Sequence, residues 1–338
     1  MIIKSIELRG LWGESSFRWN LDSEVSVLSG INGSGKSTVL RALGTLLLDR
    51  IHPGVYMDRF ERLNVRLTDG SELALCCLPK SIGELRRRSE TDPGLKEVIE
   101  TIENDSEPGH PRQIAGVMSI TAFKDGRKVD PEEVLDNFDR DFVSTFDFAP
   151  PRPKDPKELF ISMMNNSISE LDRHLDGVVD RYRSYQIELG ARLNKMISGE
   201  NPDLEKAREI FDARTRFQDR FDEMLSATGK KFNRDSGEVS FVFDADGKSH
   251  DYTHLSAGEK QLLLILLTVF MQEKRPAVLV MDEPEISMHV DWQKRLIEVI
   301  RDINPNCQLI IATHSPMIIM DGWMANVTNI HDLITSEL

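Results

Sequence analysis

A glycine-rich loop near the N-terminus is the stretch with the most evident chemistry. The residues SGINGSGKST, at 29–38, lie between the apolar run VSVL and the helical pattern VLRALGTLLL. Glycines at this spacing let backbone N–H groups converge on phosphate oxygens, while Lys36 reaches the β- and γ-phosphates and Ser37 offers an oxygen to Mg²⁺. The loop therefore predicts binding of a nucleoside triphosphate. The residues expected to contact it are Gly30, Asn32, Gly33, Ser34, Gly35, Lys36, Ser37 and Thr38.

Two apolar runs in the second half of the chain end in polar residues of catalytic type. VLVMDEPE carries Asp282 and Glu283, and QLIIATHSP carries His314. Continuous apolar runs are typical of parallel strands buried on both faces, and such sheets bind ligands at the carboxyl ends of their strands. Asp282 would then hold Mg²⁺ opposite Ser37, Glu283 would orient or deprotonate the attacking water, and His314 would contact the γ-phosphate. Each residue alone has an ordinary structural explanation, so the interpretation depends on their joint occurrence with the loop.

The segment LSAGEKQ at 255–261 opens a long apolar helix. A helix N-terminus with a serine hydroxyl and glycine amides attracts anions, which makes Ser256 and Gly258 candidates for a phosphate contact. Serine is also a common N-cap residue, and that simpler explanation of Ser256 is equally compatible with the sequence.

A parallel sheet with flanking helices must position these groups. Strands are expected at 2–9 and 24–29, and a helix at 36–50 directly after the loop. The apolar strands at 277–285 and 308–316 enclose the amphipathic helical sequence VDWQKRLIEVIRDI. A strand, a helix and a second strand in this order predict a parallel pair.

Antiparallel hairpins and two long helices are expected in the middle of the chain. LNVRLTDGSELALCC contains two alternating runs joined by an Asp-Gly turn, and similar turns occur in AFKDGRKV and FVFDADGKSH. Apolar residues recur at helical spacing from about 156 to 226 with a break at 198–203, which predicts two antiparallel helices. They would project as an arm on the order of 50 Å or pack on the core, and both can hold at once. The polar segment 84–112 is expected to be a loop with short helices.

The composition is that of a globular chain with an acidic balance. It has 338 residues, of which 40% are hydrophobic and 29% charged, and its net charge is −14 at pH 7. This balance argues against a surface that coats nucleic acid, and the short clusters RRR, PRPKDPK and GKKFNR are more typical of a solvated face than of a DNA-contacting groove. The longest apolar run, LLLILLTVFM, is too short to span a bilayer, and the sequence MIIKSIELRG has no signal-peptide core. A cytoplasmic protein without a membrane partner is therefore expected, with its three cysteines in the core.

Taken in order, the four segments resemble the head of an ABC-type ATPase. The resemblance identifies GINGSGKST as Walker A, LSAGEKQ as the signature, VLVMDEPE as Walker B with its catalytic glutamate, and ATHSP as the switch-histidine segment. It implies ATP and Mg²⁺ as cofactors, with Lys36, Glu283 and His314 as catalytic residues. In this superfamily the signature contacts the γ-phosphate held by the partner head. Ser256 and Gly258 would therefore act across a homodimer in which two heads sandwich two ATP molecules.

The implied fold class is α/β: a P-loop NTPase of the ABC-ATPase head type, with a mixed sheet, an antiparallel β subdomain and an inserted antiparallel helical hairpin. The expected division is 1–155 and 231–338 for the two halves of the head, and 156–230 for the insertion. More than two hundred residues separate Lys36 from Ser256, far more than in transporter ATPases, and the insertion lies where SMC, RecF and RecN-like heads insert their arms. The segments DEPEISMHVDWQ and ATHSP are most similar to the small bacterial ATPases grouped with OLD nucleases and with PtuA-like and AriA-like phage-defence subunits.

The sequence departs from these families at three points. It has no convincing Q-loop glutamine, although FVSTFDFAP is the equivalent region and Gln113 a weaker candidate. It has no Cys-x-x-Cys at the tip of the helical pair, which excludes a zinc hook. The residues after His314 are too few for the nuclease domain that OLD proteins carry there.

These features predict an ATP-driven regulatory or motor subunit of an antiphage-defence or DNA-processing complex, with a nuclease-like effector on a separate chain. A DNA-repair ATPase of RecF type is the main alternative, and it requires a basic DNA-facing surface. A transporter energy subunit is a third possibility, which the long insertion disfavours. The sequence leaves open whether DNA is a direct partner.

Overall fold

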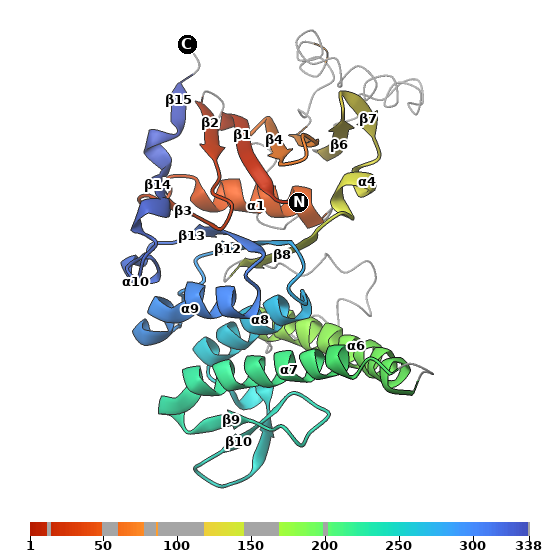
Figure 1. Cartoon of the computed structure of the whole chain (residues 1–338). Helices are drawn as coiled ribbons and strands as arrows, with labels where there is room; N and C mark the ends of the chain where they lie inside the picture. The colour runs from red at the N-terminus through yellow and green to blue at the C-terminus, as the bar shows by residue number, and fades with distance from the viewer. Residues whose placement is uncertain are drawn as a thin grey trace, which may run out of the picture.

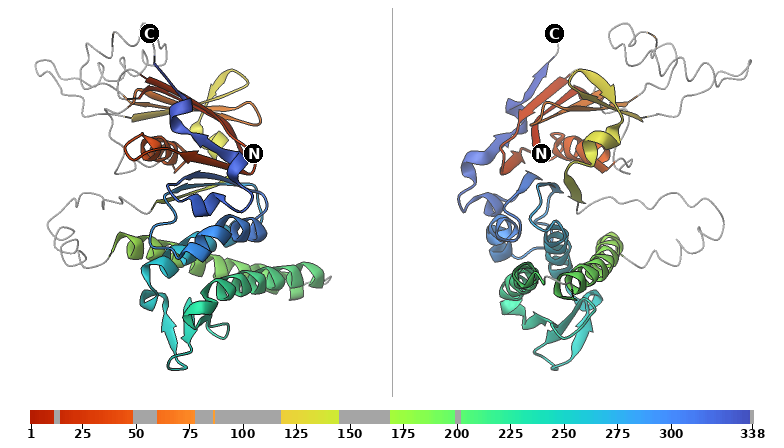
Figure 2. Two further views of the ribbon diagram at one scale, coloured as in Figure 1. Left: turned by 90° about the vertical axis from the view of Figure 1, so that its left-hand side faces the viewer. Right: turned by 45° about the vertical axis from the view of Figure 1, so that its right-hand side comes forward.

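The structure, a computed structural model, describes residues 1–11, 15–48, 60–77, 86, 118–144, 169–198 and 202–336. They form layers, which Figure 1 shows from top to bottom. An antiparallel sheet is followed by α1 (Lys36–Leu48), a parallel sheet, the helices α8 (Ala257–Met271) and α9 (Val290–Ile303), two long helices and a small sheet. Figure 2 shows the same order of layers from two other sides.

Five parallel strands form the central sheet, in the order β14-β3-β13-β12-β8. Every residue of β12 and β13 is buried, as predicted for strands covered on both faces. The sequence prediction missed β8, which begins with three charged residues, and β14, which has only three residues. The bounds are β3 (Val25–Ser29), β8 (Asp139–Ser144), β12 (Ala277–Asp282), β13 (Cys307–Ala312) and β14 (Val327–Asn329).

Seven antiparallel strands form the upper sheet, in the order β15-β2-β1-β4-β5-β6-β7. The two Asp-Gly hairpins predicted here, β4–β5 and β6–β7, are confirmed. β2 and β15 were missed, and they pair with each other from opposite ends of the chain, with Ile334 opposite Phe17. The bounds are β1 (Ile3–Leu11), β2 (Ser15–Asn20), β4 (Arg62–Leu67), β5 (Glu72–Cys77), β6 (Met118–Lys124), β7 (Arg127–Val129) and β15 (Ile334–Ser336).

The parallel sheet separates two hydrophobic clusters. On one face, alternate residues such as Val278 and Ile310 pack with α1 and the inner face of the antiparallel sheet. On the other face, Leu279 and Ile311 pack with α8, α9 and the long helices. This double coverage explains why β12 and β13 are apolar without alternation, and it holds the carboxyl ends of the strands at one edge of the sheet.

The two long helices, α6 (Glu170–Ser198) and α7 (Leu204–Leu225), lie along α8. The aromatic ring of Phe217 stacks on that of Phe270, with centroids 4.7 Å apart. Near the end of α6, Arg192 pairs with Glu273, which follows α8, at 2.5 Å. The packing on the core expected for this pair is therefore confirmed, and it is compatible with an arm. The division of the chain at 156–230 stays a prediction.

A small antiparallel sheet, in the order β11-β10-β9, lies beyond α7. Its β10–β11 hairpin is the one predicted from FVFDADGKSH, and Phe241 packs on Phe221 of α7 with ring centroids 5.4 Å apart.

None of the helices in the described ranges is long and apolar enough to cross a membrane. The remaining elements are β9 (Lys230–Phe232), β10 (Ser240–Phe243), β11 (Ser249–Asp251), α4 (Pro131–Leu135), α10 (Pro316–Ile319) and the 3-10 turns η2 (Ser226–Thr228), η3 (Tyr252–His254), η4 (Met324–Asn326) and η5 (Ile330–Asp332).

Several predictions fall outside the described residues. They concern the loop at 84–112 apart from residue 86, the Q-loop candidates at 145–150 and 113, and the helical pattern at 156–168. The cysteines Cys76, Cys77 and Cys307 are buried, as expected for small core residues.

Candidate functional site

The glycine-rich loop connects the carboxyl end of β3 to the first turn of α1. Gly35 has a φ of +97°, a conformation that residues with a Cβ rarely adopt. At Gly30, an added Cβ would lie 2.7 Å from Cγ2 of Ile330, so no larger residue fits without a shift. Strand, turn and helix therefore have the local geometry that the spacing of the glycines predicted.

Lys36 folds back under this loop. Its side chain is buried, and its Nζ donates to the carbonyl oxygens of Gly30 at 2.9 Å and Ile31 at 3.0 Å. Burial lowers the pKa of Lys36, while the nearby carboxylates of Glu283 and Asp282 act in the opposite direction. The ammonium group is thus held at the base of the phosphate loop, facing the carboxylates at the end of β12.

Asp282, the last residue of β12, contacts the phosphate loop directly. Its Oδ1 accepts a hydrogen bond from Ser37 Oγ at 3.0 Å, and its Oδ2 lies 3.5 Å from Nε of Arg41. Burial raises the pKa of Asp282 to about 6, against the lowering effect of Arg41 and Ser37. A hydroxyl and a carboxylate oxygen side by side are the hard ligands that Mg²⁺ prefers.

The described residues contain no group of three or more His, Cys, Asp or Glu side chains arranged as a metal cage. Mg²⁺ often takes one or two protein ligands and completes its shell with waters and substrate phosphates. Ser37 and Asp282 fit that pattern.

Glu283 and His314 face each other across the ends of β12 and β13. Nε2 of His314 lies 3.5 Å from Oε1 of Glu283, and the imidazole is about one-third exposed at 33%. Glu283 has a φ of +50°, unusual for a residue with a side chain, and its N–H donates to the carbonyl of Ala312 at 2.8 Å. Such a conformation persists only where the surroundings enforce it, and it aims the carboxylate toward the phosphate loop.

Glu285 is a residue of the site that sequence reasoning missed. Its Oε1 accepts three hydrogen bonds from the loop after β13: from Oγ1 of Thr313 at 2.7 Å, and from the N–H groups of His314 at 2.8 Å and Ser315 at 3.1 Å. Its Oε2 is buried and has no hydrogen-bond partner. The carboxylate thus fixes the histidine loop against the loop after β12. Its position after Asp-Glu-Pro was the signal in the sequence, but its partners are 28 to 30 residues away.

Gln293 of α9 extends this network. Its Oε1 accepts from Oγ of Ser315 at 2.6 Å, and its Nε2 donates to the carbonyl of Met288 at 2.9 Å. The histidine loop is therefore held from two sides, by a carboxylate and by an amide.

These groups surround one pocket of about 770 Å³. That volume is in the range of small-molecule sites. The hydroxyl of Ser34, in the phosphate loop, is buried and has no hydrogen-bond partner, as expected beside a site that receives hydrogen-bonding phosphates. The lining residues are Asn32, Gly33, Gly35, Lys36, Ser37, Thr38, Glu283, Glu285, Ile286, Gln293, His314 and Ser315.

Ser256 and Gly258 are not among the residues that line this pocket. Ser256 is exposed and caps α8 in a reciprocal arrangement: its N–H donates to Oε2 of Glu259 at 2.7 Å, and its Oγ accepts from the N–H of Glu259 at 3.4 Å. Gly258 packs against the loop after β12, where an added Cβ would lie 2.2 Å from the carbonyl oxygen of Ser287. The ordinary N-cap explanation thus accounts for the contacts of Ser256 within one chain.

A phosphate loop after β3, an acidic pair at the end of β12 and a histidine after β13 define the class: a P-loop ATPase head of the ABC type. The chain belongs to the family described as "AAA domain, putative AbiEii toxin, Type IV TA system", whose model matches residues 25–321. The resemblance seen in the sequence is therefore confirmed at the level of family and fold.

Individual relatives agree with this placement. The chain is similar to the Septu protein PtuA of Bacillus thuringiensis, with 23% identity over 337 residues that cover 94% of this chain and 72% of that protein. It is 30% identical over 94 residues to a probable metal transport system ATP-binding protein of Chlamydia pneumoniae, covering 27% of this chain and 37% of that protein. Among solved structures it is similar to an SMC head bound to the C-winged helix domain of ScpA, with a TM-score of 0.53 at 14% identity and coverage of 97% and 94%. That likeness concerns the fold alone.

Proposed function

We propose that this protein binds and hydrolyses ATP with Mg²⁺, and that it is the regulatory or motor subunit of a cytoplasmic antiphage-defence or DNA-processing complex. Its effector, a nuclease-like protein, would be on a separate chain. The observation that carries the ATPase assignment is the convergence of Lys36, Ser37, Asp282, Glu283 and His314 on one pocket edge. The similarity to PtuA along nearly the whole chain supports the defence assignment.

Each residue has a role that follows from its position. Lys36 places a positive charge beside the β- and γ-phosphates, and Ser37 with Asp282 holds Mg²⁺, which neutralises the charge that develops on the phosphates. Glu283 orients the attacking water and accepts its proton. His314, held by the Glu285 network, contacts the γ-phosphate and is in reach of Glu283. Catalysis in such a site comes mainly from positioning and electrostatic stabilisation.

In this proposal, Ser256 and Gly258 contact the ATP that a second chain binds. Ser256 is exposed at the N-terminus of α8 and does not line the pocket of its own chain. A helix N-terminus carries a partial positive charge, so it would attract the γ-phosphate bound by a partner head. The proposed active unit is a homodimer with two ATP molecules between the heads.

Phosphate release by the purified chain tests the ATPase assignment. Glu283→Gln keeps the size of the side chain but cannot accept the water's proton, so turnover should fall by about 10²- to 10⁴-fold while ATP still binds. Lys36→Ala should lose ATP binding. Glu298→Gln, an exposed change of the same type on α9, is the matched control and should behave like wild type. Wild-type turnover in Glu283→Gln would refute the role given to this carboxylate.

Ser256→Arg tests the composite site separately. This variant should bind ATP with wild-type affinity, because Ser256 is absent from the pocket lining of its own chain, but it should neither dimerise with ATP nor hydrolyse it. Light scattering in the presence of ATP measures whether the variant dimerises. Glu283→Gln, in which the ATP-bound dimer should accumulate, is the reference. A Ser256→Arg chain that dimerises and turns over at the wild-type rate would leave Ser256 as a helix cap only.

A further inference from the structure

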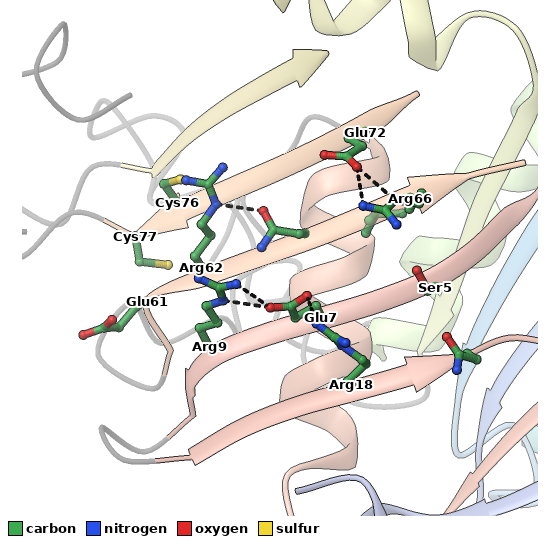
Figure 3. Close-up of a pocket in the computed structure, with 13 residues that line it drawn as sticks. Ser5, Glu7, Arg9, Arg18, Glu61, Arg62, Arg66, Glu72, Cys76 and Cys77 are labelled. Atoms are coloured by element: carbon green, nitrogen blue, oxygen red, sulfur yellow. Dashed lines mark hydrogen bonds and ion pairs between the residues drawn. The ribbon is translucent and has the colours of Figure 1, made fainter. Parts of the chain in front are cut away.

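The outer face of the antiparallel sheet contains a hollow lined by arginines (Figure 3). It has a volume of about 550 Å³ and lies on the sheet face opposite to the one that packs on α1. All four cations that line it are arginines from three adjacent strands: Arg9 of β1, Arg18 of β2, and Arg62 and Arg66 of β4. No residue proposed above to bind ATP belongs to this face. We refer to these four residues as the arginine face.

The strands of this sheet concentrate positive charge in an acidic protein. They contain eight lysines and arginines against two glutamates, whereas the whole chain has a net charge of −14. Local charge of the opposite sign to the net charge raises the local concentration of anions and speeds their association. The RecF-type alternative requires a basic surface that faces DNA. The short basic clusters singled out in the sequence do not include the arginines of this sheet.

The register of the sheet places two of these arginines directly opposite each other. Arg9 of β1 pairs with Arg62 of β4, so both side chains leave the same face of adjacent strands. Like charges in that arrangement destabilise a sheet. Glu7 pairs with Arg9, and Asn64 accepts from Nε of Arg62, so the sheet tolerates two guanidinium groups side by side at a hollow where an anion can contact both.

Three glutamates, Glu7, Glu61 and Glu72, line the hollow beside the four arginines, so the arginines outnumber them by one. Figure 3 shows Arg9 and Arg18 both reaching Glu7, at 2.8 Å and 2.9 Å, and Arg66 pairing with Glu72 at 2.6 Å. Lysine would carry the same charge at these positions, but only arginine presents a planar fork of donors that matches two oxygens of one phosphate. The choice of arginine at all four positions points to phosphate.

We propose that the arginine face binds phosphate groups, either of a nucleic-acid backbone or of a small phosphorylated ligand. The hollow is large enough for a nucleotide-sized group, and the basic residues on neighbouring strands of the same sheet extend the attraction to a longer polyanion. This site does not depend on the ATPase assignment, because it is on another sheet and is tested without ATP.

Two probes distinguish the sources of phosphate. The first is a fluorescein-labelled 20-nucleotide DNA, single-stranded or duplex, with 5′-hydroxyl ends, read by anisotropy without Mg²⁺ or ATP. The second is inorganic phosphate, read by calorimetry in the Lys36→Ala background so that the phosphate loop does not contribute. The test variant is Arg9→Ala with Arg62→Ala. Its matched control removes the same charge from exposed positions on α6 and α7, by Arg183→Ala with Arg208→Ala.

The test variant should bind the recognised probe on the order of tenfold more weakly, and the control should bind like wild type. Affinity for DNA should fall steeply with salt, because each neutralised phosphate releases counterions. Binding of DNA but not phosphate assigns a nucleic-acid backbone, and binding of phosphate alone assigns a small ligand. Failure of the wild-type chain to bind either probe at low salt, or equal weakening in test and control variants, would overturn the site.

Thermal stability distinguishes a ligand-binding role of these arginines from a purely structural role. Because the repulsion between Arg9 and Arg62 across the strands offsets what the hydrogen bond from Arg62 to Asn64 contributes, Arg62→Ala alone should change the melting temperature little at low salt. Inorganic phosphate should raise the melting temperature of Lys36→Ala more than that of the triple variant that also lacks both arginines. A marked loss of stability in Arg62→Ala would show that the arginine holds the sheet together and would count against a ligand.

Discussion

The carboxylate of Asp282 should lower the stability of the free protein at neutral pH. The side chain is 2% exposed, and burial raises its pKa from the ordinary 3.8 to about 6. Since one pKa unit corresponds to ~1.4 kcal/mol, keeping this group charged costs up to about 3 kcal/mol of folding free energy. Asp282→Asn removes the charge at similar size and should recover part of that free energy. For a chain of this length, full recovery would raise the melting temperature by roughly 4 °C, so we expect a rise below that value.

The sign of the effect sets its pH window. Because the folded-state pKa of Asp282 is above the unfolded-state value, the destabilisation is complete above about pH 6, shrinks as the pH falls toward 3.8, and is absent below it. Scanning calorimetry of wild type and Asp282→Asn, without nucleotide, should therefore show a gain at pH 8 that is much smaller at pH 4.5. The exposed Asp291→Asn is the matched control, with 72% of its side chain accessible.

Mg²⁺ supplies the complementary measurement. MgATP should stabilise wild type and have little effect on Asp282→Asn, because the amide removes the charge that holds the cation. If Asp282→Asn melts at or below the wild-type temperature at pH 8, or gains the same amount at both pH values, then burial of the charge is not what shifts this group, and the reasoning fails.

Two further predictions concern the loops around the pocket. Glu285→Gln keeps an oxygen for the donors of the histidine loop and should lower kcat less than Glu285→Ala. The alanine variant removes the acceptor that these three donors share and should lower kcat on the order of a hundredfold. Equal effects of the two changes in steady-state assays would contradict a positioning role. Gly258→Ala should cost about 2–4 kcal/mol in urea unfolding, because its Cβ would meet the carbonyl of Ser287 at 2.2 Å. Gly237→Ala, which meets nothing within 4 Å, is its control, and indistinguishable midpoints would refute the close packing.

Local signals in the sequence predicted the phosphate loop and the hairpins well. The spacing of Gly30, Gly35 and Lys36 specifies a turn between a strand and a helix within a few residues, and Asp-Gly turns specify tight hairpins in the same way. The continuous apolar runs of β12 and β13 predicted burial on both faces, and both strands are fully buried.

Features that depend on distant partners were not predictable. β15 has three residues and forms only because β2 offers an edge, and β8 begins with three charged residues but pairs with β12. The role of Glu285 depends on a loop that becomes its neighbour only through the β12–β13 register. The arginine face likewise needs the register that brings Arg9 opposite Arg62. Single-sequence patterns describe local conformation, and these features are set by tertiary pairing.

The order of strands in the central sheet has a consequence for biosynthesis. β3, made first, lies between β13 and β14, so that Val25 pairs with Leu309 and Val27 with Val327. A ribosome adding about 5–20 residues per second needs roughly 15 to 60 s to produce the chain between these partners. During that time the strand that leads into the phosphate loop has no parallel neighbour, and its apolar residues are open to non-native contacts. A product truncated before β13 would lack both the support for this strand and the histidine loop, so incomplete chains would not compete with finished ones for ATP.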